Sequence, residues 1–214
     1  MRRTSPRRPS GRDAPRRPTA PWALALATLL SPSAARAVED PLDVIRASNQ
    51  EMLNLYAADK GKADPRVDRM AFEVMDRVTS FSQIAAAAID GFCDDPQGAQ
   101  CVEFKNVFIK LLRTSAVRKL GRYRADRFDY LPEKVGQTTA VVPTVAYYDD
   151  DEIELDYHLR LLEGHWVIVN YIVDGVDTIR NYRKQFSRML KRGSMDSVIR
   201  RLRKRIRELE EESE

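Results

Sequence analysis

The chain has 214 residues, of which 36 are basic, 32 are acidic and 43% are hydrophobic. This apolar content excludes a wholly disordered chain, and the length suits one domain or two small ones. Residues 1–37 contain eight arginines and one acid, a net charge of +7, whereas the whole chain carries +4. The remaining residues are therefore net acidic, at −3, and the overall positive charge gives no argument for nucleic-acid binding.

Residues 1–37 have the three-part plan of a secretory signal peptide. A basic, proline-rich stretch precedes a nine-residue apolar run at 22–30, and the small residues Ala35 and Ala37 follow. Nine residues are too few to cross a bilayer, which takes about 20 residues in a helix. We expect export with cleavage after Ala37. The alternative is a basic tail that contains an apolar run by chance.

Cys93 and Cys101 are the two cysteines of the chain, with seven residues between them. In an exported protein such a pair most simply forms one disulfide, which would contribute about 2–3 kcal/mol by closing a short loop. A metal site would need further ligands, and the histidines at 158 and 165 lie far along the chain. A redox role would need closer spacing.

Helical periodicity dominates the first part of the expected mature chain. Apolar residues recur three or four positions apart, and Pro65 and Gly91 mark a helix start and a helix end. The expected helices cover residues 43–56, 65–78, 81–90, 104–112 and 176–214, with a break in the last at Gly193.

From about Arg124 the period changes to two, which predicts antiparallel strands over residues 127–131, 140–148, 153–161 and 165–173. A three-residue turn at 149–151 would pair Val145 with Leu155, and a two-residue turn at 163–164 would pair Leu159 with Ile168. On this register the three longer strands share one apolar face. The sequence predicts an α+β fold: one curved, four-stranded antiparallel sheet with helices packed over its apolar face. The expected domain covers 38–207, and an acidic C-terminal tail covers 208–214.

Catalytic and metal-binding signatures are absent from the sequence, which has only two histidines and no glycine-rich phosphate loop. The acids at 149–152 could bind a cation or form a hydrophilic turn, and they lack the glycine and distal glutamate of a calcium loop. The basic cluster at 200–207 could contact a membrane or a partner, or it could be the solvated face of an amphipathic helix. We expect no enzyme activity, no metal, no cofactor and no nucleic-acid partner.

Several ordered motifs resemble one known family. They are VDGVD at 173–177, NYRKQF at 181–186, GSMDSVI at 193–199, FSQIA at 81–85, Gln100 with Phe104 and Phe108, and Val142 with Pro143. Together they resemble the MlaC family of periplasmic phospholipid-binding proteins, over most of residues 41–205. Asp177 differs from the serine usual in the family, and Asn170 differs from a frequent aspartate.

The resemblance implies a non-catalytic periplasmic lipid shuttle that encloses the acyl tails of a phospholipid cargo in a hydrophobic pocket between sheet and helices. Its implied partners are an outer-membrane lipoprotein complex and an inner-membrane ABC transporter complex with a substrate-binding ring, which together maintain outer-membrane lipid asymmetry. The candidate tail contacts are Phe104, Phe108, Leu111, Val141, Val145, Leu155, Tyr157, Leu159, Ile168, Val176, Ile179 and Tyr182.

Two other functions remain open at this point. One is an enzyme on a cone-shaped α+β fold, with Tyr157 or a pocket acid as proton donor. The other is an envelope interaction module with a filled core that binds partners through its basic helix. Phospholipid bound to protein purified from cells would distinguish the carrier from both.

Overall fold

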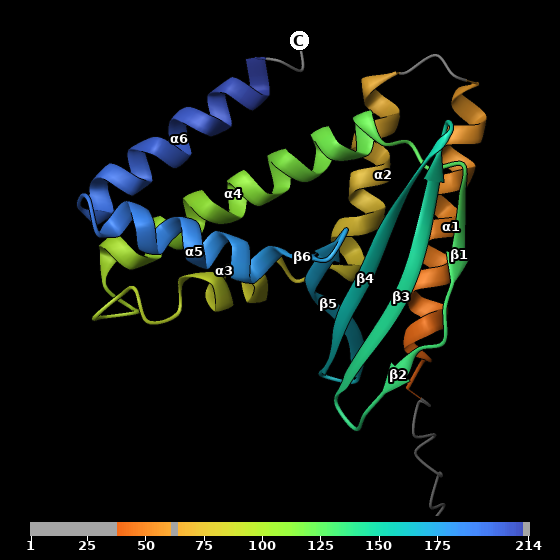
Figure 1. Ribbon diagram of the computed structural model, residues 1–214, viewed down its shortest axis with the longest axis horizontal. Helices are drawn as coiled ribbons and strands as arrows, with labels where there is room; N and C mark the ends of the chain where they lie inside the picture. The colour runs from red at the N-terminus through yellow and green to blue at the C-terminus, as the bar shows by residue number, and fades with distance from the viewer. Residues whose placement is uncertain (1–37, 61–63, 212–214) are drawn as a thin grey trace, which may run out of the picture. The chain divides into compact units, whose positions relative to one another are not determined.

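A computed structural model describes residues 38–60 and 64–211, and the expected signal peptide lies outside these residues (Figure 1). The described helices are α1 (Pro41–Asp59), α2 (Pro65–Val78), α3 (Phe81–Ile89), α4 (Ala99–Arg122), α5 (Thr178–Leu190) and α6 (Met195–Glu211). The strands are β1 (Arg127–Tyr130), β2 (Lys134–Val135), β3 (Thr139–Tyr148), β4 (Asp151–Leu162), β5 (His165–Val173) and β6 (Val176–Asp177). Helix α6 includes residues 208–211 of the expected acidic tail.

Side-chain caps fix where four of the helices begin. Asp40, Asp64, Ser80 and Asp177 each accept a hydrogen bond from a backbone N–H in the first turn of α1, α2, α3 and α5, respectively. A cap of this kind stabilises a helix by about 1 kcal/mol. Pro41 and Pro65 occupy the first positions of α1 and α2, where a missing N–H costs nothing.

The strands form one antiparallel sheet in the order β1-β3-β4-β5-β6, and β2 also pairs with β3. This confirms the predicted α+β class and all four predicted strands. The two-residue strands β2 and β6 were not expected, and the sheet is not strongly curled. Two residues give too little alternation for a sequence pattern to indicate a strand.

The predicted register between β3 and β4 is wrong by one residue. Tyr148 pairs with Asp151, so the turn contains two residues instead of three, and Val145 lies opposite Glu154 rather than Leu155. Asp149 in this turn has a φ of 49°, a left-handed conformation that aspartate tolerates better than most residues. A shift of one residue moves every β3 side chain to the other face.

The predicted register between β4 and β5 is correct near the turn. Leu159 pairs with Ile168 as expected, but a bulge at Val169 then shifts the pairing, so that Tyr157 lies opposite Tyr171. Asn170, which the predicted register placed beside Tyr157, instead accepts a hydrogen bond from the backbone N–H of Ile179 in the first turn of α5.

The helices pack in two groups on one face of the sheet, which we call its inner face. Helix α1 lies along β3 with α2 beside it, and α4 packs against α2, α3 and α6 (Figure 1). Three separate apolar clusters result: a helical cluster centred on Phe104, Phe108 and Phe186, a sheet cluster that includes Ile45, Val142 and Leu159, and a small α1–α2 cluster of Met52, Ala71 and Val74. None of the described helices has the length and apolarity to cross a bilayer.

A buried ion cluster joins the ends of three helices. The Arg124 guanidinium, just after α4, pairs with Asp59 at the end of α1 and with Asp68 in α2, the latter at 2.8 Å. It also donates to the backbone carbonyl of Asp64 at 3.1 Å. The Asp59 side chain is only 4% exposed, and pairing with the Arg124 guanidinium offsets part of the cost of burying its charge.

We expect Arg124→Ala to lower the free energy of unfolding by about 3–5 kcal/mol, because it removes the guanidinium that pairs with the buried Asp59 carboxylate. Urea unfolding measures the change. The matched control is Arg66→Ala, whose side chain is 80% exposed, so that its pair with Asp64 should contribute little to stability. Equal losses in the two variants would contradict the assignment.

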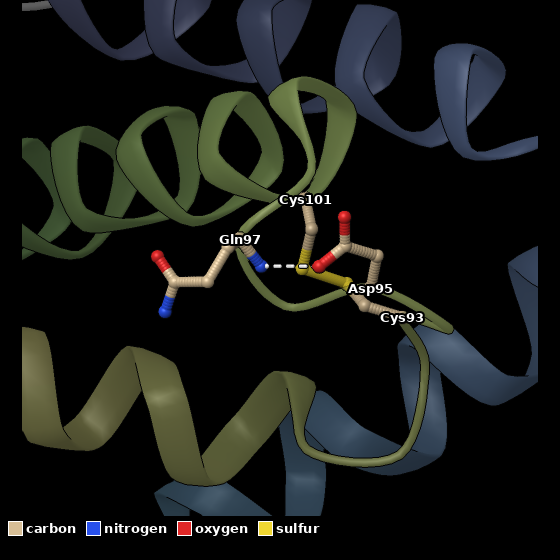
Figure 2. Close-up of a disulfide and its surroundings, with 4 residues drawn as sticks. All are labelled: Cys93, Asp95, Gln97 and Cys101. Carbon is tan, nitrogen blue, oxygen red and sulfur yellow. Dashed lines mark hydrogen bonds between the residues drawn. A yellow bond between two sulfur atoms is a disulfide. The ribbon is translucent and has the colours of Figure 1, made fainter.

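The Cys93–Cys101 disulfide predicted from the sequence is present, with a Cα–Cα distance of 6.0 Å (Figure 2). It connects the loop that follows α3 to the first turn of α4, which has no side-chain cap. Within the closed loop, the backbone N–H of Gln97 donates to Asp95 at 3.0 Å (Figure 2). The bridge therefore fixes the start of the longest described helix against α3.

Cys93→Ser with Cys101→Ser should lower the melting temperature by about 4–12 °C, since the bridge contributes about 2–3 kcal/mol by restricting the unfolded chain. Calorimetry of the oxidised protein and of the double variant gives the difference. Unchanged melting would show that the bridge is absent in solution or restricts little.

Candidate functional site

A cavity of about 880 Å³ lies between the inner face of the sheet and the helices. All six described helices and five of the strands contribute residues to its lining. Binding sites for organic ligands typically occupy about 300–1,000 Å³. The interior between sheet and helices is thus not filled by its own side chains.

The cavity has a closed end and an open end. At the closed end Ile45 and Ile168 are 1% exposed, whereas at the open end Glu152 and Asp174 are exposed to solvent. Along β4 the lining runs from Glu152 to Tyr157, and five residues of strand span about 17 Å. The site is therefore elongated along β4 and reaches solvent beside exposed lining residues such as Glu152 and Asp174.

Small side chains on β3 help to create the space. After the register correction, the buried residues of β3 are Ala140, Val142, Thr144 and Ala146, and Ala146 lines the cavity. The Thr144 hydroxyl donates to the carbonyl of Leu155 at 2.7 Å, so its polar group is satisfied within the sheet. Large residues at these positions would fill the space between the sheet and the helices.

Polar groups in the buried part of the cavity bond to one another. The Tyr157 hydroxyl donates to Asn49 Oδ1 at 3.0 Å, and Asn49 Nδ2 donates to the Tyr130 hydroxyl at 3.3 Å. Tyr171 and Thr79 form a second hydroxyl pair. Because these groups have partners already, a ligand in the cavity needs no matching hydrogen bonds along its length.

Burial raises the pKa of the Tyr157 hydroxyl, and the nearby Tyr171 raises it further, while the hydrogen bond with Asn49 opposes them. Burial likewise raises the pKa of Tyr171, against the hydrogen bond with Thr79. A general acid or base works best with a pKa near the operating pH. These tyrosines are shifted in the opposite direction, which weakens the enzyme hypothesis built on Tyr157.

Six of the twelve candidate contacts line the cavity: Leu111, Leu155, Tyr157, Ile168, Val176 and Tyr182. Their contact with a ligand stays a prediction. Phe104, Phe108 and Ile179 belong instead to the helical cluster, because the neighbouring helices pack against their side of α4 and α5. Leu159 is buried in the sheet cluster with Ile45 of α1. Val141 and Val145 lie on the opposite face of the sheet, because the register differs by one residue.

Sequence reasoning missed the contribution of α1 and much of that of α4. Ile45, Asn49 and Met52 of α1 line the cavity, as do Ala116 and Lys119 of α4. Apolar spacing indicated that residues 43–56 have a buried stripe, but the same stripe would serve a filled core. The polar Asn49 within that stripe was the one available signal.

The fold and the cavity define a class: an α+β protein whose helices and antiparallel sheet enclose one deep, mostly apolar binding site. Within this class, the chain belongs to the MlaC family, whose family model, described as "MlaC protein", matches residues 46–204. The MlaC family is periplasmic. The comparison with curated proteins returned no match.

A solved structure shares this fold. It is a phospholipid-binding protein from Ralstonia solanacearum, determined in complex with a phospholipid. The similarity covers 80% of this chain and 99% of that chain, with 18% sequence identity and a TM-score of 0.69. At this identity the comparison supports the α+β arrangement.

The raised pKa values predict how stability depends on pH. Folding favours the neutral form of Tyr157 and Tyr171, so the stability that they contribute is complete below about pH 10 and is lost as the pH rises above it. We expect a variant with Tyr157→Phe and Tyr171→Phe to lose stability less steeply above pH 10 than the wild type. Denaturant unfolding between pH 8 and about pH 11 tests this, and parallel curves would contradict it.

Proposed function

We propose that the protein is exported, that its signal peptide is removed after Ala37, and that the mature domain (38–207) carries a phospholipid with its acyl tails in the cavity. The observation that carries this proposal is the cavity itself, with a volume of about 880 Å³ and a mostly apolar lining. Membership of the periplasmic MlaC family and the phospholipid complex of the Ralstonia solanacearum protein add support.

The magnitude of the hydrophobic effect explains why such a carrier needs an enclosed site. Two acyl tails of about 15 methylenes each, at about 0.8 kcal/mol per methylene, cost on the order of 25 kcal/mol to expose to water. Unassisted passage across an aqueous compartment is then negligibly slow. A cavity that buries both tails removes most of this cost, and no catalytic step is required.

The partners in this proposal are an outer-membrane lipoprotein complex and an inner-membrane ABC transporter complex with a substrate-binding ring. Exchange between them would maintain the lipid asymmetry of the outer membrane. Family membership is the support for both partners. The exposed mouth of the cavity gives a lipid a direct route in and out.

Ala116→Trp tests the proposal, because Ala116 lines the cavity from α4 and an indole there would occupy space that the tails need. We expect organic extraction and mass spectrometry to find phospholipid in the wild type purified from the periplasm, and to find several-fold less in this variant. The melting temperature shows whether each protein is folded.

The matched control is Ala47→Trp, at an exposed position of α1 that does not line the cavity. It should retain the lipid content of the wild type. Wild-type protein without lipid would refute the carrier. Full lipid content in folded Ala116→Trp protein would show that the tails bind elsewhere.

A further inference from the structure

Charge is distributed unevenly along the chain. Residues 178–211, which include α5 and α6, contain twelve basic and four acidic residues, a net charge of +8. Helix α4 has six basic residues and one acidic residue, a net charge of +5. Residues 123–177, which include the whole sheet, contain twelve acidic and four basic residues, a net charge of −8. Three helices are therefore strongly basic, although the expected mature chain is net acidic.

Helix α6 has one buried side and one exposed side. The buried residues are all apolar: Val198, Ile199, Leu202, Ile206 and Leu209. Arg200, Lys204 and Arg207 recur three or four positions apart between these residues, and all three are exposed. Residues at this spacing lie on one face of a helix. We call these three residues the outer basic face.

Other charged residues of α6 are used in its packing against α4. Arg203 pairs with Glu103 of α4 at 2.8 Å, and Glu210 pairs with Lys110 of α4 at 2.9 Å. These residues lie on the flank of α6 that is turned toward α4. The outer basic face is therefore not needed to hold α6 in place.

The outer basic face keeps most of its charge. Lys204 pairs with Glu208 at 3.6 Å, but Glu208 also pairs with Arg205 at 3.2 Å. Arg200 and Arg207 make no ion pair with any other residue that the structure describes. The rise of the helix from Arg200 to Arg207 is about 10 Å. Because this is close to the Debye length of about 8 Å at physiological ionic strength, the three cations act together on a charged surface that faces them.

The basic surface continues from α6 onto α4. A groove of about 310 Å³ lies between the two helices, with Arg207 on one side and Asn106 and Lys110 on the other. Apart from Asp196 at the start of α6, the described acids of this helix all lie in the range 208–211. The acids therefore do not interrupt the outer basic face, and Glu211 lies beyond its last member.

We infer that the outer basic face is a docking surface for an anionic membrane. The inference goes beyond the proposed function, since it does not require a lipid in the cavity. Clusters of about four to eight basic residues on an amphipathic helix are attracted to anionic lipid surfaces. Residues 200–207 contain six basic residues and no acid.

The composition of this face favours a lipid surface over an acidic protein. The core of a protein–protein interface is apolar, often aromatic, and depleted in charged residues. The apolar residues of α6 are instead buried within the domain, and its outer basic face presents long, flexible cations. Such cations suit a fluid layer of phosphates, which adapts to their positions and needs no apolar contact.

Docking through the outer basic face also orients the domain. The neighbouring residues Arg201 and Arg205 line the main cavity, so the α6 wall of the cavity lies near the membrane. In Figure 1, α6 lies on the left and β1 and β3 lie on the right, which separates the basic helix from these strands. An anionic surface repels the acidic sheet, which therefore points away from it.

The experiment mixes the mature protein with sedimentable vesicles of phosphatidylcholine, either alone or with an equal part of phosphatidylglycerol, and measures the protein that sediments. We expect binding to the anionic vesicles and none to the neutral ones, although the protein is itself net acidic. Raising the salt from about 0.01 M to about 1 M shortens the Debye length from about 30 Å to about 3 Å. Because no apolar side chain inserts, this increase should release the protein.

Arg200→Gln with Lys204→Gln and Arg207→Gln should weaken binding to the anionic vesicles by a factor on the order of a hundred, because each cation near such a surface contributes to the attraction. All three positions are exposed, so the fold should tolerate the glutamines. The melting temperature shows whether the variant is folded.

The matched control is Arg69→Gln with Lys134→Gln and Arg160→Gln, at exposed positions of α2, β2 and β4. It has the same net charge as the first variant, and it should bind the anionic vesicles much as the wild type does. An equal loss in the two variants would show that net charge alone matters and would overturn the inference.

Unchanged binding in the first variant, or equal binding of the wild type to neutral vesicles, would also overturn the inference. Wild type that does not bind the anionic vesicles would do the same and would leave the outer basic face to an acidic protein. The proposed carrier is tested separately. Purified protein that contains phospholipid but does not bind vesicles leaves the carrier intact, whereas vesicle binding without bound phospholipid refutes only the carrier.

Discussion

The cavity exists because helices such as α4 and α5 bury their apolar faces against other helices and not against the sheet. Phe186 of α5 lies edge-on against both Phe104 and Phe108 of α4, at 5.0 and 4.9 Å between ring centroids. Aromatic pairs of this geometry are favourable beyond the area that they bury. Helix α1 separately covers the sheet cluster. Where these two packing arrangements adjoin, the side chains of the described residues leave a volume of about 880 Å³ open.

The buried ion cluster around Arg124 complements this division. It links the ends of α1 and α4 and the start of α2, so the helices that flank the cavity on two sides are fixed to one another at one point. The disulfide does the same between α3 and α4. Helix α6, in contrast, packs chiefly against α4 and contributes Arg201 and Arg205 to the lining of the cavity. An ion cluster and a disulfide thus link the helices α1 to α4, all of which line the cavity.

Most of the fold follows from the sequence, because capping residues, prolines and the change of period all agree. The register of β3 does not follow from the sequence. Val141, Val142 and Val145 make both faces of this strand apolar, so the alternation of residues cannot indicate which face points inward. The β5 bulge at Val169 likewise has no local signal. Because of the register, the candidate contacts Val141 and Val145 lie on the face of the sheet opposite to the one expected. Sequence patterns also cannot distinguish a phenylalanine such as Phe108, which fills a core, from a leucine such as Leu111, which borders a void.

The small inner residues of β3 have a mechanical consequence. Hydrostatic pressure favours the state of smaller volume, and the volume lost on unfolding scales with the internal space that is eliminated. An occupant that fills the space beside Ala146 removes much of that difference. The empty protein is therefore the more compressible form, and it gives way at lower pressure than the filled one. Filling the cavity thus also supports its walls mechanically.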